Sequence, residues 1–140
     1  MASKNDLLKF VEQNDVKFIR LQFTDIFGNM KNIAITDQQL EKALEEGVMF
    51  DASAIAGFSE VEQSDMLLFP DPDTFQLIPW RPQHGKVARF ICDIKNYDGS
   101  QFLGDPRYIL KRAEARAKQL GYTFNIGPEC EFFLFHTDAE

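Results

Sequence analysis

The sequence is poor in the residues that would cross-link it or build a histidine-rich metal centre. Its 140 residues include only two cysteines, Cys92 and Cys130, and two histidines, His84 and His136. Both cysteines lie in apolar, strand-like runs, which predicts reduced core thiols in a cytoplasmic protein rather than a disulfide. The histidines are too few and too widely separated to suggest a His-based metal site.

Other absences exclude whole classes of partner. No apolar run reaches membrane-spanning length, and the first residues lack the apolar segment of a signal peptide. Basic residues are in the minority, with 15 Lys and Arg against 22 Asp and Glu, so the net charge is −7. Non-specific nucleic-acid binding needs a basic surface, so nucleic acid is not an expected partner. The lack of a long apolar run likewise makes a membrane an unexpected partner. No P-loop or Rossmann glycine motif is present, so a nucleotide site would depend mostly on residues beyond Glu140.

What the chain does contain is an alternation of helical and extended patterns typical of an α+β protein. Hydrophobic residues make up 44% of the sequence and 14 residues are phenylalanine, which is enough for a globular core. The patterns predict a helix after Ser3, strands over 16–24 and 30–35 joined by a turn at Gly28-Asn29, and a helix over 38–46 that ends at Gly47. They also predict strands over 74–78 and 87–94, a helix from Pro106 with Asp105 as its N-cap, and a strand over 123–135. The stretch 50–68 is expected to be less regular. The last helix is expected to pack through an inner stripe of Ile109, Leu110, Ala113, Ala117 and Leu120.

Two carboxylates lie inside the apolar segment 127–135. On a strand, residues i and i+2 share a face, so Glu129 and Glu131 would project together while Cys130 faces the core. Ionised carboxylates beside apolar groups are costly unless they are paired or bind a cation, and Mg²⁺ and Mn²⁺ prefer carboxylate oxygens. The pattern is therefore compatible with a pair of metal ligands. The alternative is an edge strand whose glutamate face is simply solvated.

A change of pattern near 99–105 predicts a domain boundary, with one domain over 1–103 and the start of a second over 104–140. The second part would hold one helix and one strand. A single apolar strand cannot satisfy its own backbone groups. The chain is therefore expected to be the front part of a longer protein, unless an oligomer partner or the first domain covers the strand.

Six sequence blocks follow one another along nearly the whole chain. They are Ile-Arg-Leu-Gln-Phe-Thr-Asp at 19–25, Phe-Asp-Ala-Ser-Ala-Ile at 50–55, Glu-Gln-Ser-Asp-Met at 62–66, Gly-Lys-Val-Ala-Arg-Phe-Ile-Cys-Asp-Ile at 85–94, Gly-Asp-Pro-Arg at 104–107 and Gly-Pro-Glu-Cys-Glu-Phe-Phe at 127–133. Together they resemble the N-terminal part of a type I glutamine synthetase of the form found in Firmicutes. The resemblance implies a β-grasp-like N-terminal domain followed by the first helix and strand of an α/β catalytic domain. It also implies ATP-dependent ligation of ammonia to glutamate through γ-glutamyl phosphate, in a cytoplasmic, ring-forming dodecamer.

The resemblance further implies roles for three carboxylates. Glu129 and Glu131 match the family's ligands for two Mg²⁺ or Mn²⁺ ions, Glu129 on the nucleotide side and Glu131 on the glutamate side. Asp51 matches the aspartate of the ammonium site, which in the family reaches the active site of a neighbouring subunit. A carboxylate suits that role because it attracts NH₄⁺ and can accept its proton. Without the resemblance, Asp51 would be interpreted as a turn or cap residue.

Three positions depart from the family pattern. Ala52 and Ala54 replace Gly and Ser, and Glu60 stands where the Firmicutes form often has an Arg associated with feedback inhibition by glutamine. We therefore expect weak inhibition by glutamine, or none. The departures keep open a non-catalytic assembly or regulatory module of the same fold, and a relative acting on another amine, such as a polyamine, is a third option. The 140 residues alone are expected to be inactive, because they hold only two of the ligands that two metal ions need.

Overall fold

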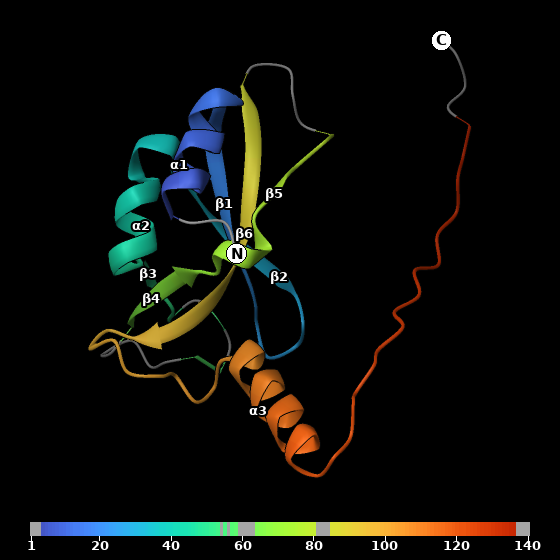
Figure 1. Cartoon of the computed structure of the whole chain (residues 1–140). Helices are drawn as coiled ribbons and strands as arrows, with labels where there is room; N and C mark the ends of the chain where they lie inside the picture. Colours follow the sequence, from blue (N-terminus) through green and yellow to red (C-terminus); the bar gives the residue numbers. More distant parts are fainter. Residues whose placement is uncertain (1–3, 54, 56, 59–63, 81–84, 137–140) are drawn as a thin grey trace.

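The computed structural model describes residues 4–53, 55, 57–58, 64–80 and 85–136. Its sheet has the strand order β2-β1-β6-β4-β3, with a short β5 also paired to β6. Helices α1 and α2 lie on one face of the sheet, and α3 extends from its lower end (Figure 1). The elements are α1 (Lys4–Gln13), β1 (Val16–Thr24), β2 (Met30–Thr36), η1 (Asp37–Gln39), α2 (Leu40–Glu46), β3 (Val48–Asp51), β4 (Asp65–Pro70), η3 (Pro72–Thr74), β5 (Gln76–Leu77), β6 (Lys86–Asn96) and α3 (Pro106–Gln119).

The β1–β2 hairpin forms where the alternating pattern and the turn residues predict it. Gly28 has a φ of 81°, a conformation that costs glycine little. The buried Asp25 organises the turn, because its Oδ1 accepts hydrogen bonds from the backbone N–H groups of Phe27 and Asn29 at 2.9 Å each. The strand expectations for this hairpin are confirmed.

The long strand β6 joins the two halves of the sheet. Residues 86–91 pair in parallel with β1, and residues 92–96 pair antiparallel with β4. A parallel pair needs a long crossover, and here β2, α2, β3 and β4 lie within it. The expected strand over 87–94 is therefore confirmed, and it lies at the centre of the sheet. This mixed sheet with helices on one face has the expected α+β, β-grasp-like architecture.

The expectation of an irregular stretch over 50–68 was wrong at both of its ends. Strands β3 and β4 pair with each other, and β4 also pairs with β6. Strand β3 has only four residues, and a run that short shows little alternation in sequence. Its backbone finds partners through the sheet, so long-range pairing decides its conformation where the local pattern does not. The expected strand over 74–78 is shortened to β5 (Gln76–Leu77) after the 3₁₀ turn η3.

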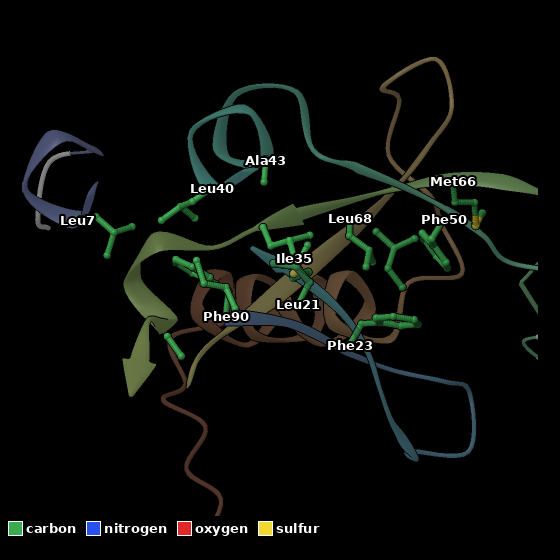
Figure 2. Packing of buried hydrophobic residues seen from close by; sticks show 14 of the residues in the cluster. Leu7, Leu21, Phe23, Ile35, Leu40, Ala43, Phe50, Met66, Leu68 and Phe90 are labelled. Atoms are coloured by element: carbon green, nitrogen blue, oxygen red, sulfur yellow. The ribbon is translucent and has the colours of Figure 1, made fainter. Parts of the chain in front are cut away.

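One hydrophobic core lies between the sheet and the two helices α1 and α2. Figure 2 shows Leu40 and Ala43 of α2 directed toward strand residues such as Leu21 and Leu68. Phe90 of β6 is completely buried, and its ring centroid lies 5.2 Å from that of Phe75. Burying one such large apolar side chain contributes about 1.5–3 kcal/mol. The remaining buried members are Leu7, Val11, Val16, Ile19, Phe23, Ile35, Phe50, Ala52, Phe58, Met66, Ala88, Cys92 and Ile94.

The expectations for the last 35 residues were only partly met. Helix α3 begins at Pro106 with Asp105 as its N-cap, as predicted, but it has no buried residue. Most of its expected inner stripe is exposed, with Ile109 at 52% and Leu120 at 56%, and only Ala117 is half-buried. The expected strand over 123–135 is absent, and residues 122–136 project from α3 in an extended conformation without a partner strand in the described part of the chain (Figure 1). A strand needs neighbours for its backbone hydrogen bonds, which explains the missing strand. The stripe of α3 is exposed because no second layer of the described residues packs against it.

The two thiols differ in their environment. Cys92 is buried, as expected, but Cys130 is exposed, which corrects the expectation that both lie in the core. Cys130 is on the extended segment, where no second layer covers it. None of the helices in the described ranges has the length and apolar character needed to cross a bilayer.

Candidate functional site

Asp51 lies at the end of β3, where the strand leaves the sheet. Its Oδ1 accepts a hydrogen bond of 2.9 Å from the backbone N–H of Ser53. Hydrogen bonds from the Ser53 hydroxyl and backbone N–H lower the pKa of Asp51, and the Ser64 side chain adds to this effect. The Asp51 side chain is exposed, and the register places Asp65 of β4 directly opposite it. The end of the β3–β4 pair therefore presents two carboxylates to solvent, an arrangement that attracts cations.

Ala52 fixes the backbone next to Asp51. It is fully buried, and its N–H donates to the carbonyl of Ser64 at 2.8 Å. Among the described non-glycine residues only Asp15 has a positive φ, so Ala52 does not need the conformational freedom of glycine. The replacement of glycine at this position is therefore compatible with the local backbone. Ala54 and Glu60, the other two departures from the family pattern, lie outside the described residues.

Glu129 and Glu131 lie on the extended segment that follows α3. Both side chains are exposed. Figure 1 shows this segment on the opposite side of the molecule from β3, so the structure does not bring the two glutamates together with Asp51. No group of three or more His, Cys, Asp or Glu side chains in the described residues is arranged to hold a metal ion. Two carboxylates provide hard oxygen donors that suit Mg²⁺ or Mn²⁺, but they supply only part of a coordination shell.

A second polar cluster was not foreseen from the sequence. Arg107 of α3 reaches two carboxylates, with Nη2 at 2.5 Å from Asp71 Oδ2 and Nη1 at 2.8 Å from Asp93 Oδ1. Lys111, one turn further along α3, contacts Asp93 at 2.8 Å. Burial alone would raise the pKa of Asp71, but the Arg107 side chain and the Asp73 N–H lower it. We call these four charged residues, Asp71, Asp93, Arg107 and Lys111, the α3 ion network.

Asp105 connects α3 to the sheet at the same place. Its side chain is 1% exposed, and Oδ1 accepts the N–H of Arg107 at 3.0 Å as the helix N-cap. Oδ2 accepts the N–H of Ile94 in β6 at 3.1 Å. The pairing of β1 with β6 ends at Ile91, so Asp105 accepts a hydrogen bond from the part of β6 that extends beyond β1. Burial raises the pKa of Asp105, and the two backbone hydrogen bonds oppose that shift.

A cavity of about 460 Å³ lies between the hairpin end of the sheet and the first turns of α3. Most of its wall is apolar, and the lining includes one guanidinium and one buried carboxylate. It is lined by Phe23, Thr24, Met30, Ile91, Cys92, Asp105, Pro106, Arg107 and Leu110. Arg107 and Asp105 are already engaged by carboxylates and backbone N–H groups, so the cavity offers few free polar groups to a ligand.

Comparisons with known proteins find matches to two domain families along this chain. Residues 15–97 match the glutamine synthetase β-grasp domain, and residues 103–140 match the glutamine synthetase catalytic domain. A glutamine synthetase of Clostridium saccharobutylicum is 64% identical over 136 residues, which are 97% of this chain and 31% of that protein. A glutamine synthetase of Methanosarcina mazei is 54% identical over 138 residues, which are 99% of this chain and 31% of that protein. The chain thus spans about a third of the length of these curated relatives.

Solved structures show the same fold. A glutamine synthetase of Plasmodium falciparum determined by cryo-electron microscopy aligns with a TM-score of 0.75 at 27% identity, over 86% of this chain and 23% of that one. The ADP complex of GmaS aligns with a TM-score of 0.74 at 24% identity, over 86% of this chain and 26% of that one, and supports the fold alone.

Proposed function

Since this chain belongs to the glutamine synthetase family, we propose that it is the N-terminal part of a ligase that joins ammonia to glutamate with the use of ATP. The observation that carries the proposal is the 64% identity to a glutamine synthetase across 97% of the chain, through both family regions. We also propose a boundary between residues 103 and 104, with the β-grasp domain before it and the first part of the catalytic domain after it. By the resemblance described above, the full-length protein would assemble as a ring-forming dodecamer.

Asp51 is the proposed ammonium-site residue. Its hydrogen bonds lower its pKa, so the carboxylate is ionised at neutral pH and attracts NH₄⁺. Asp65 opposite it adds negative charge to the same end of the strand pair. An ionised carboxylate can accept a proton from NH₄⁺ and leave ammonia as the nucleophile. In the assembly, this side chain would serve the active site of a neighbouring subunit.

Glu129 and Glu131 are the proposed metal ligands, and the rest of the coordination shell would come from the remainder of the full-length protein. The ions, Mg²⁺ or Mn²⁺, would neutralise phosphate charge and orient ATP and glutamate. The two glutamates themselves supply fixed negative charge and hard oxygen donors at alternate positions of one segment. The segment would acquire its strand conformation when neighbouring strands pair with it.

The test uses the full-length protein and measures glutamine and ADP formed from glutamate, ammonium and ATP. We expect ammonium-dependent turnover in the wild type, and a KM for ammonium that rises at least about tenfold in Asp51→Asn, a change equivalent to about 1.4 kcal/mol. Asp98→Asn is the matched control, because Asp98 also accepts a serine N–H two residues on, at 2.9 Å, in an exposed turn. A wild-type protein without ammonium-dependent product, or an unchanged KM in Asp51→Asn, would refute the assignment.

The metal assignment has a readout that does not depend on turnover. Isothermal titration of Mn²⁺ into the full-length protein should show weaker binding in Glu129→Gln and Glu131→Gln than in the wild type. Glu114→Gln, a change on the exposed surface of α3, should bind Mn²⁺ like the wild type. Equal Mn²⁺ affinity in all four proteins would contradict the proposed ligands.

A further inference from the structure

Charged and polar side chains tie helix α3 to the sheet. None of its 14 residues is buried. Its contacts with the rest of the described chain include the α3 ion network and the two hydrogen bonds of Asp105. An apolar interface tolerates small rotations, whereas hydrogen-bonded charges favour one geometry. These groups therefore favour one direction in which α3 leaves the sheet.

Arg107 is the centre of this attachment. It binds Asp71, which follows β4, and Asp93 of β6, so one planar guanidinium holds two separate segments of the sheet. Its side chain is 22% exposed, and those of Asp71 and Asp93 are 24% and 27% exposed. This partial burial distinguishes the contacts from fully solvated ion pairs, which contribute little. A lysine cannot reproduce the forked geometry, because its ammonium is a single point charge.

Loss of Arg107 would leave two carboxylates near one another with only Lys111 to compensate. Asp93 would keep its contact with Lys111, but Asp71 would lose its ion pair and keep only the more distant charge of Lys111. Like charges that share a site repel each other. The relaxed arrangement would separate α3 from the segment after β4.

We propose that Arg107 is a positioning residue that holds the start of the catalytic region in register with the β-grasp domain. This inference rests on the proposed function. The β-grasp side carries Asp51, and the chain that follows α3 carries Glu129 and Glu131. Because Asp51 would serve the active site of a neighbouring subunit, Arg107 fixes where the β-grasp domain presents that carboxylate relative to the catalytic region of its own chain, which carries Glu129 and Glu131. Its effect is on the geometry of ammonium capture, and it touches no substrate itself.

We expect loss of the Arg107 contacts to change the KM for ammonium and not the KM for ATP. ATP and the metal ions would be bound on the catalytic side, so their site does not change when α3 tilts relative to the sheet. The ammonium site would join the β-grasp domain of one subunit to the catalytic domain of its neighbour in the ring, so a tilt between the two domains within each chain would displace Asp51 from the neighbouring site. Weakening the Arg107 contacts should therefore raise the KM for ammonium while the KM for ATP stays nearly constant.

The experiment compares full-length wild type, Arg107→Gln, Arg107→Lys and Arg116→Gln by KM for ammonium, KM for ATP and thermal unfolding. Arg116 is the matched control, since it lies on the same helix and its side chain bonds to Gln119. We expect Arg107→Gln to raise the ammonium KM about tenfold, which corresponds to about 1.4 kcal/mol, with the ATP KM changed less than about twofold. Arg107→Lys should recover part of the loss, and Arg116→Gln should match the wild type.

Several results would overturn the inference. An unchanged ammonium KM in Arg107→Gln would do so, as would equal increases in both KM values or a loss of activity fully explained by unfolding. If Arg107→Gln does not fold, Asp71→Asn decides the question, because it keeps the contact between Arg107 and Asp93 and should raise the ammonium KM about two- to fourfold. No selective rise in Asp71→Asn would refute the positioning role. A wild type without ammonium-dependent turnover would refute the proposed function and this inference with it, whereas an active wild type with insensitive variants refutes the inference alone.

Discussion

Replacing Asp105 by alanine should destabilise the 140-residue chain more than any exposed acidic substitution. The change removes the N-cap of α3, which costs about 1 kcal/mol. It also leaves the N–H of Ile94, a fully buried residue, without its carboxylate acceptor, which costs about 1–3 kcal/mol. Burial raises the pKa of Asp105, which means that the carboxylate is poorly solvated in the folded chain. Its removal therefore recovers part of the lost free energy of unfolding. We expect the free energy of unfolding to fall by about 2–3 kcal/mol at pH 7.

Urea unfolding followed by far-ultraviolet circular dichroism measures this difference. Asp98→Ala is the control, because Asp98 also accepts a backbone N–H but lies in an exposed turn, and it should cost less than about 0.5 kcal/mol. Asp105→Asn keeps one side-chain oxygen as an acceptor and should lie between the alanine variant and the wild type. Equal losses for Asp105→Ala and Asp98→Ala would show that the contact with Ile94 adds nothing.

Two further predictions concern titrating groups. Burial raises the pKa of the Cys92 thiol to about 12, whereas Cys130 is exposed, so iodoacetamide at neutral pH should alkylate one thiol of the folded chain and both thiols in urea. Mass spectrometry checks this, and rapid native labelling of Cys92 would contradict the packing of β6. For Asp71, burial favours the neutral acid, but the Arg107 hydrogen bond lowers its pKa below the usual 3.8. A lowered folded-state pKa gives stability that is present above the unfolded-state pKa and lost as the pH falls through the folded one. The stability difference between wild type and Asp71→Asn should therefore be largest above about pH 4 and shrink at lower pH, and a constant difference in urea unfolding at several pH values would argue against the Arg107 contact.

The elements with strong local signals could be predicted from the sequence. The alternation over 16–24, the turn at Gly28 and the glycine after α2 gave the hairpin and the second helix, because each signal acts over a few neighbouring residues. Gly47 does end α2, with a φ of 76°. Strands β3 and β4 were missed because their stability comes from pairing with each other and with β6.

The α3 ion network could not be predicted for a related reason. Arg107 is 36 positions from Asp71 and 14 from Asp93, and a charged residue carries no local mark of its distant partner. Asp105 was recognised as a helix cap from the Asp-Pro pair, but its bond to Ile94 depends on where β1 ends. The segment with Glu129 and Glu131 has a clear strand pattern in the sequence. It forms no strand, because no neighbouring strand among the described residues pairs with it.

The late position of β6 in the chain has a consequence for synthesis on the ribosome. The register pairs Val16 with Lys86, so β1 is made 70 residues before the strand that completes its inner edge. The β1–β2 hairpin ends at Thr36, 50 residues before Lys86, so at about 5–20 residues per second it waits roughly 2.5–10 s with an open edge. Open edges recruit other strands. A nascent chain of this protein is thus most exposed to misassembly and to chaperone binding in that interval, and codons that slow translation between β2 and β6 would lengthen it.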